Sequence, residues 1–150
     1  MSFNITLDNL KTTLEGDAAL LSYCSTQFGK THTVKRVFKK RTEISVDELP
    51  IMLITRPDVT PEKWRPTERE YTHNALVYCG FYCEDREAAQ KILVEFEELM
   101  ETAILTYKNP SMLPEGITDI DPKAALNDEG YYHPAYFFVK TIEIQETRQL

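Results

Sequence analysis

The fold is decided by Pro50-Ile51-Met52-Leu53-Ile54-Thr55, a short and almost wholly apolar stretch in the middle of the chain. A brief apolar run of this length is typical of a strand with little exposure to water. It follows the helical phrase Leu14-Glu15-Gly16-Asp17-Ala18-Ala19-Leu20-Leu21 and precedes a second long strand and an amphipathic helix. The stretch therefore predicts a strand from Leu49 to Arg56.

Apolar residues recur near the N-terminus at intervals of three and four positions, namely Leu7, Leu10, Leu14, Ala18 and Leu21. This spacing predicts an amphipathic helix. Gly16 weakens its middle by about 1 kcal/mol, so a break is expected there. The Asp17 carboxylate can then accept the free amide protons of a second short helix that runs to about Thr26 and ends at Gly29.

The next segment, residues 32 to 41, mixes β-branched residues with cations, and it predicts an edge or solvent-facing strand. Five positive charges occupy seven positions: Lys35, Arg36, Lys39, Lys40 and Arg41. Outward cations of this kind form a solvated face, guard a sheet edge, or contact a partner's acidic surface or a phosphate backbone. We keep these five residues as candidate interface residues.

Three prolines and the only tryptophan lie between Pro57 and Thr67, which predicts an irregular projecting loop. Trp64 stands between Lys63 and Arg65. A large aromatic side chain on an exposed loop is a candidate anchor for a partner, whereas the alternative is that it folds back onto the core. Trp64, Lys63 and Arg65 complete the set of interface candidates.

The second half of the chain predicts a long strand, a helix and a last strand. The strand runs from about Arg69 to Cys83, and the helix from Arg86 to about Leu105 has an apolar stripe that should lie on the sheet and Asp85 as its cap. Residues 106 to 131 show little periodicity and predict a long loop, in which Asp121-Pro122 begins a one- or two-turn helix. The last strand spans roughly residues 131 to 147.

Length and composition place the chain among globular proteins. Its 150 residues suffice for one domain, residues 1–150, and its net charge is -7. We expect no membrane segment, because no apolar run reaches the roughly 18 residues that a spanning helix needs. Three cysteines, an odd number, favour free thiols in a reducing compartment, the cytoplasm of the cell that makes the chain.

The cysteines and histidines form no recognisable metal or nucleophilic motif. Cys79 and Cys83 would lie about 13 Å apart in a strand, too far for one zinc ion. The three histidines, His32, His73 and His133, are far apart in the sequence. Cys24 with one of them could form a nucleophilic pair, but no local motif supports it. We therefore expect no catalytic residue, no metal site and no cofactor.

Acidic residues offer the one remaining catalytic alternative. Asp119 and Asp121 could share a face with Asp128 and Glu129, as the carboxylates of metal-dependent nucleases do. The simpler interpretation is that Asp121 caps a helix and the other three are solvated.

The order of helix, basic strand, apolar strand, loop, long strand, amphipathic helix and final strand resembles the tail terminator, or tail-completion, proteins of long-tailed bacteriophages. The resemblance covers most of the chain. It is carried by the phrases Leu14 to Leu21, Leu49 to Ile54, Val77 to Ala89, and Tyr136-Phe137-Phe138-Val139-Lys140-Thr141-Ile142-Glu143-Ile144.

This resemblance implies an α+β fold, with a mixed or mainly antiparallel sheet of about four strands, an N-terminal helix and one long amphipathic helix packed on it. It also implies a ring, usually a hexamer, that caps the tail tube in the virion. The ring would contact a tail tube protein and a neck or connector protein, and viral DNA would pass through its lumen without sequence-specific binding.

Three alternatives stay open at this point. The chain could be a head-completion or neck adaptor protein, a small metal-dependent nuclease that uses Asp119 and Asp121, or a nucleic-acid-binding module that uses residues 35 to 41.

Overall fold

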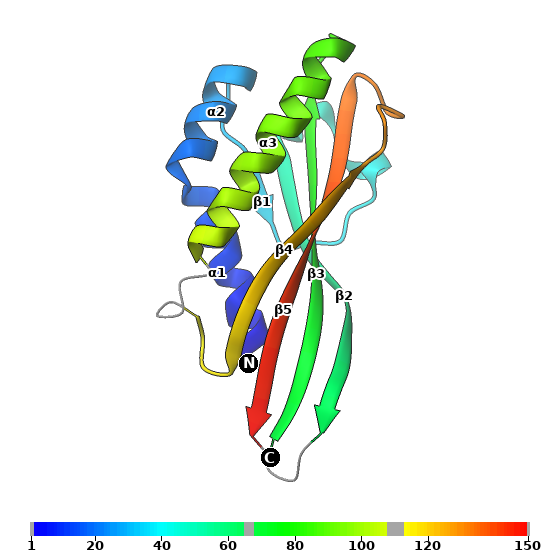
Figure 1. Cartoon of the computed structure of the whole chain (residues 1–150). Coiled ribbons are helices and arrows are strands. Elements are labelled where there is room, and N and C mark those ends of the chain that lie inside the picture. Colours follow the sequence, from blue (N-terminus) through cyan, green and yellow to red (C-terminus); the bar gives the residue numbers. More distant parts are fainter. Residues whose placement is uncertain (1, 65–67, 108–112, 150) are drawn as a thin grey trace.

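Three helices cover one face of a five-stranded mixed sheet in the computed structural model of the chain, which describes residues 2–64, 68–107 and 113–149 (Figure 1). The strands lie in the order β1-β2-β3-β5-β4. Strand β1 pairs with β2 in parallel, and all other neighbours are antiparallel. The predicted α+β class is therefore confirmed, with five strands rather than four.

The helices end where the sequence predicts. Helix α1 spans Ser2–Gly16 and α2 spans Ala18–Phe28. The Asp17 carboxylate accepts a hydrogen bond from the Leu20 amide at 3.0 Å, and Gly29 ends α2 in the left-handed region at φ 76°. Helix α3, Arg86–Tyr107, begins after Asp85, whose Oδ1 accepts from the Glu87 amide at 2.9 Å.

The three central strands of the sheet are longer than its two edge strands. Strand β2 spans Ile51–Trp64, β3 spans Glu68–Tyr82 and β5 spans Ala135–Gln149. Strand β3 pairs with β5 along its whole length, from Glu68 opposite Gln149 to Tyr82 opposite Ala135. The edge strands are shorter: β1 is Thr33–Lys35 and β4 is Ile117–Asn127.

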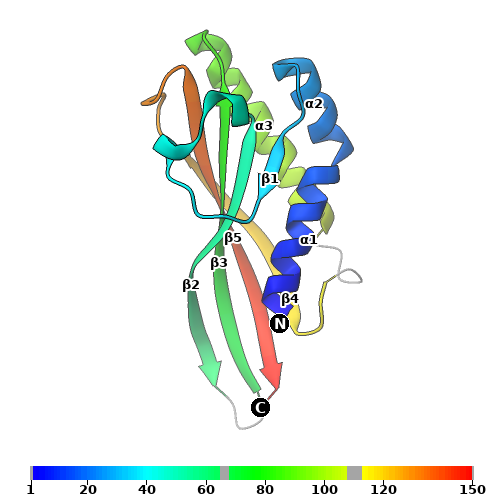
Figure 2. The same ribbon diagram turned by 180° about the vertical axis from the view of Figure 1, so that it is seen from behind.

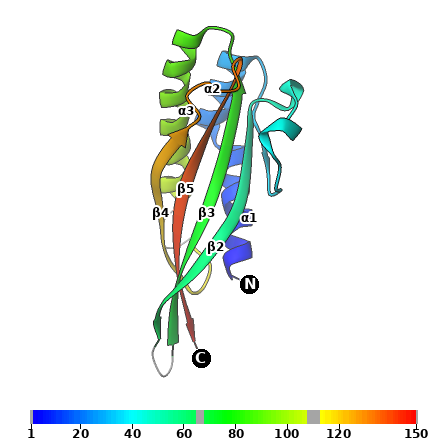
Figure 3. The same cartoon turned by 90° about the vertical axis from the view of Figure 1, so that its right-hand side faces the viewer.

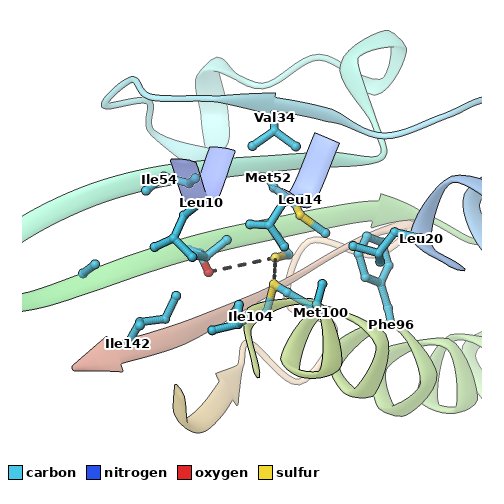
Figure 4. Close-up of a cluster of buried hydrophobic side chains, with 14 of the residues drawn as sticks. Leu10, Leu14, Leu20, Val34, Met52, Ile54, Phe96, Met100, Ile104 and Ile142 are labelled. Atoms are coloured by element: carbon cyan, nitrogen blue, oxygen red, sulfur yellow. Dashed lines mark hydrogen bonds between the residues drawn. The ribbon is translucent and has the colours of Figure 1, made fainter. Parts of the chain in front are cut away.

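The main core lies between the helices and the sheet. Alternate residues of β3, among them Ala75, Val77, Cys79 and Phe81, face the helices and are fully buried, as the period of a strand requires. Figure 4 shows the side chains that meet them from α1, α2, β1, β2, α3 and β5, which include Leu10, Leu14, Leu20, Val34, Met52, Ile54, Phe96, Met100, Ile104 and Ile142.

The prediction of a strand over residues 32 to 41 is wrong beyond Lys35. Residues 36–50, here called the connector, leave the sheet and fold over its other face, with short 3₁₀ helices at Arg41–Glu43 and Val46–Glu48 (Figure 2). Under the connector lies a second, smaller core of Leu49, Ile51, Leu53 and Phe137, against which Val37 and Ile44 pack. Burial of these two side chains favours a covering segment over a longer edge strand.

The prediction of a loop from Pro57 is wrong as far as Trp64, because β2 continues to that residue. The rest of that prediction, residues 65–67, lies outside the described residues. Since β1 pairs only with Ile51 to Leu53, the rest of β2 is an edge strand within the described part of the chain. An edge strand tolerates proline, which lacks only the N–H that points away from the neighbouring strand. Irregularities between Thr55 and Asp58, and between Pro61 and Lys63, absorb the remaining distortion.

The long loop predicted for residues 106 to 131 contains β4, and the short helix predicted at Asp121-Pro122 is a strand. Strand β4 is the other edge of the sheet, and an edge strand tolerates a proline such as Pro122. A shift in register between Pro122 and Ala125 absorbs the distortion.

A buried ion cluster joins α3 to the sheet. The Lys140 ammonium group on β5 lies 2.5 Å from Glu97 Oε1 and 3.1 Å from Glu101 Oε1, one turn apart on α3. The lysine side chain is only 2% exposed, whereas the two glutamates are 24% and 38% exposed. Burial alone would lower the pKa of Lys140, but the two carboxylates outweigh it and raise the pKa.

The lower ends of β2, β3 and β5 extend beyond the helices as an arm (Figure 3). We define the arm as residues 60–64, 68–72 and 145–149, which the pairing register places side by side. Phe3, in the first turn of α1, stacks on His73 at 4.2 Å between ring centroids, so the arm starts just past the end of the helical layer.

Candidate interaction surfaces

Three of the five clustered cations hold the connector in place. Arg36 donates to Asp8 Oδ1 on α1 at 2.7 Å, and Lys39 donates to Glu48 Oε2 at 2.6 Å. The Lys39 bond is the main reason that the pKa of Glu48 falls to about 2. Both cations form ion pairs within the chain, so they are less available to an outside partner than the sequence suggests.

Arg41 is the third cation that is paired within the chain. Its guanidinium lies 3.2 Å from Asp128 Oδ2 and within 6 Å of the Tyr132 and Phe137 ring centroids. It therefore links the connector to the loop between β4 and β5 through an ion pair and cation–π contacts.

Lys35 and Lys40 remain exposed and form no ion pair within 4 Å among residues 2–64, 68–107 and 113–149. Between them in sequence lies Phe38, whose side chain is 81% exposed. Exposed cations around an exposed aromatic ring are the composition expected of a contact surface, and the sequence pattern had indicated only the cations.

Two of the three candidates around Trp64 lie at the tip of the arm. Lys63 and Trp64 end β2, in register with Glu70 and Arg69 of β3, while Arg65 falls outside the described residues. The structure thus brings Lys63 and Trp64 to the end of the molecule far from the connector, and the seven candidates within the described residues do not form one site (Figure 1).

A polar network lies where the arm meets the body. The Nε2 of buried His73 lies 2.7 Å from Glu146 Oε1, and Arg148 binds the same oxygen at 3.0 Å. Burial opposes ionisation of Glu146, but the hydrogen bonds from His73 and Arg148 outweigh it and lower its pKa. Arg148 also lies over the Tyr71 ring, 4.3 Å from its centroid. The network could not be predicted from the sequence, because His73 and Glu146 are 73 residues apart and only the pairing of β3 with β5 brings them together.

An open groove of about 1170 Å³ lies beside this network, between α1, the connector and β5. Its lining includes Phe3 and Ile54 as apolar residues and Arg36, Glu146 and Arg148 as charged ones. The charged residues already pair within the chain, as described above, so the groove is not a preformed site for a single ion.

The loop between β4 and β5 forms a second exposed surface at the opposite end from the arm (Figure 1). Tyr131 is 81% exposed and packs edge-on against Tyr132, with ring centroids 4.9 Å apart. The backbone beneath is fixed by hydrogen bonds, including the Tyr131 amide to Asp128 O at 3.1 Å and the Gly130 amide to Asp128 Oδ1 at 3.1 Å. A rigid loop that displays a tyrosine is suited to protein contact.

The structure lends no support to a nucleophilic pair of Cys24 with a histidine, in agreement with the lack of a local motif. Burial raises the pKa of the Cys24 thiol to about 11, so it is a poor nucleophile near neutral pH. The His32 ring Nε2 bonds instead to Leu14 O at 2.5 Å. Cys79 is buried against Met100, with the two sulfurs 3.3 Å apart.

The acidic residues considered as a metal site are spread along β4. Asp119 and Asp128 stand near opposite ends of the strand, about 25–30 Å apart at about 3.3 Å per residue. Asp121 pairs with Lys123 at 2.7 Å, and Asp128 pairs with Arg41. The nuclease site considered as an alternative is therefore not assembled from these residues, and the described residues contain no group of three or more potential ligands that could hold a metal ion.

No helix in the described ranges is both long enough and apolar enough to span a membrane.

Comparison with known proteins finds proteins of similar structure but none of similar sequence. No protein-family model matches the chain, and no curated protein matches its sequence. Among solved structures, the fold is similar to that of a chain in the virion of a native gene transfer agent particle. The TM-score is 0.57 at 10% sequence identity, and the match covers 93% of this chain and 92% of the other. The likeness extends over nearly the whole length of both chains and concerns the fold.

Proposed function

We propose that the chain is a structural protein of a phage-like virion, and more specifically a tail terminator. In this proposal about six copies of the chain form a ring that caps the tail tube, stops its growth and presents a docking surface to the neck or head. The protein acts by its shape and requires no catalysis and no cofactor.

The observation that carries the proposal is the fold likeness to a virion chain, which covers 93% of this chain and 92% of the other. A fold alone does not determine a function, so the surfaces must also suit the task.

The placement of the arm and of the Tyr131 loop supports an adaptor between two different partners. The arm, with Trp64 at its tip, lies at one end of the molecule, and the rigid Tyr131 loop lies at the other (Figure 1). A terminator has to contact the tail tube on one side and a neck or connector protein on the other. Two surfaces that point in opposite directions meet this requirement.

The charge of the chain supports passage of viral DNA rather than its capture. The net charge is -7, and three of the five clustered cations are already paired within the chain. A net negative charge, with most of the clustered cations already paired, gives weak attraction to phosphates, so DNA can pass through a lumen without adhering to its wall.

The test is the mass of the purified protein by light scattering, alone and after mixing with tail tubes from the same genome, followed by electron microscopy. We expect a ring of about six copies, either free or as density on one end of the tube. A monomer that leaves both tube ends bare would contradict the terminator, and binding of that monomer to isolated neck proteins would identify a neck adaptor instead.

A further inference from the structure

Charge is segregated between two surfaces of the chain. Residues 30–48, which contain most of the connector and are here called the basic surface, hold six basic and three acidic residues, a net charge of +3. The remaining residues together carry -10. Residues 84–101, here called the acidic surface, comprise most of α3 and its cap and hold seven acidic and two basic residues. The two surfaces are thus complementary in charge.

Both surfaces also display apolar side chains. Phe38 and Val46 are exposed on the basic surface. Val94 is exposed on the acidic surface, and Leu105 is exposed on α3 just beyond it. Both are in line with Glu87 and Glu98 on the side of the helix that faces away from the core. These four are half of the large apolar side chains that are exposed in the described ranges, so they are concentrated where the charges are complementary. An apolar centre with a charged rim is the usual anatomy of a protein–protein contact.

The two surfaces lie on opposite sides of the sheet. Figure 3 shows α3 on one side of the strands and the connector on the other. A chain cannot bring its own two surfaces together. Two copies can do so in a head-to-tail contact, in which the basic surface of one copy meets the acidic surface of the next, and such contacts generate a ring when the rotation closes.

DNA fits the basic surface less well than a second copy does. Arg36, Lys39 and Arg41 are already paired with carboxylates. Lys30 donates to the backbone oxygen of Asp47. Of the six cations of the basic surface, only Lys35 and Lys40 are exposed with neither kind of contact in the described residues. Two cations neutralise few phosphates, and the charge of -10 on the rest of the chain repels the duplex. Exposed Phe38 adds nothing to phosphate binding, whereas it adds buried apolar area to a protein contact.

We infer that neighbouring copies of this chain contact one another by packing the basic surface of one copy against the exposed face of α3 of the next. The inference rests on the proposed ring and assigns its subunit interface to named surfaces. The arm and the Tyr131 loop then stay free for the tube and the neck.

Charge reversal with rescue tests this contact. The variants K35E/K40E and E87K/E98K each place like charges across the interface, and each should weaken self-association at low salt by about tenfold or more. The combined variant K35E/K40E/E87K/E98K keeps the net charge of -7 and restores opposite charges, so it should regain assembly. The control K11E/K123E makes the same change in net charge as K35E/K40E, outside both surfaces, and should assemble like the wild type.

Cross-linking separates failure of this inference from failure of the proposed function. With the photoreactive residue p-benzoylphenylalanine in place of Phe38, the expected product is a dimer of copies joined between position 38 and α3, Arg86–Tyr107. Rings that cap tubes but cross-link elsewhere, or charge variants that assemble normally, would overturn the interface and leave the terminator standing. The expected cross-link in oligomers that never bind tubes would support the interface and refute the terminator. Absence of any self-association, with or without tubes, would refute both.

Discussion

Replacement of Lys140 by methionine probes the attachment of α3 to the sheet. Methionine keeps nearly the same length and apolar volume, so the change removes the ammonium group and little packing. It leaves Glu97 and Glu101, one helical turn apart, without the cation that both contact. Removal of one partner from a fully buried ion pair costs about 3–5 kcal/mol. Because these two carboxylates are 24% and 38% exposed and can turn toward water, we expect about 1–3 kcal/mol here.

Comparison of two substitutions at Lys140 separates the contribution of its charge to stability from the contribution of its packing. Lys140→Ala removes the ammonium group and also three buried methylenes, each worth about 0.8 kcal/mol, so it should cost about 2 kcal/mol more than Lys140→Met. The informative comparison repeats Lys140→Met in the Glu97→Gln/Glu101→Gln background. With no carboxylates left unpaired, the loss should shrink to about 1 kcal/mol or less.

The assay is equilibrium unfolding in urea followed by circular dichroism at 222 nm, with an unchanged dependence of free energy on urea as the check that unfolding stays two-state. An equal loss for Lys140→Met in both backgrounds, or no loss in either, would refute the argument that the ion cluster holds α3 against the sheet.

Three further predictions concern the sheet and its surfaces. Gly80→Ala should destabilise the fold by about 1–3 kcal/mol in the same urea assay, because the added Cβ would lie 2.6 Å from the Phe137 ring in the second core; unchanged stability would contradict the packing under the connector. Glu146 has a lowered pKa when folded, so its stabilisation is present above its ordinary pKa of 4.5 and is lost as the pH falls through the lower folded value. The melting temperature of the wild type should therefore exceed that of Glu146→Gln at pH 7, and the difference should shrink as the pH falls below 4.5; a constant difference would contradict the sign. Tyr131→Ala should leave the melting temperature within about 2 °C, since the side chain is 81% exposed, and should weaken neck or tube binding; unchanged binding to both would exclude the loop as a contact.

Local rules predicted the helices from the sequence. The break at Gly16, the cap at Asp17 and the end at Gly29 depend on neighbouring backbone groups alone, and all three appear in the structure. The long strand after Arg69 and helix α3 were also predictable, because their apolar periods are clear over more than ten residues.

The lower part of β2 and the whole of β4 were not predicted from the sequence, because their conformation depends on their place in the sheet. Pro57, Pro61 and Pro122 indicated loops, but these residues lie in strands whose outer edges are free in the described residues, and edge position is a property of the whole sheet. The same limit applies to the surfaces. Pairing of Arg36 with Asp8 on α1, and of Arg41 with Asp128 near the other end of the chain, cannot be read from the cluster of cations itself.

The most direct test of the tail terminator is tube growth. Tail tube protein from the same genome would be polymerised with and without this chain, and tube lengths and ends would be measured by electron microscopy. The account predicts tubes that stop growing, with a ring of density on one end, and loss of that ring in the K35E/K40E variant. Tubes that grow to the same length with bare ends in the presence of excess protein would contradict the account.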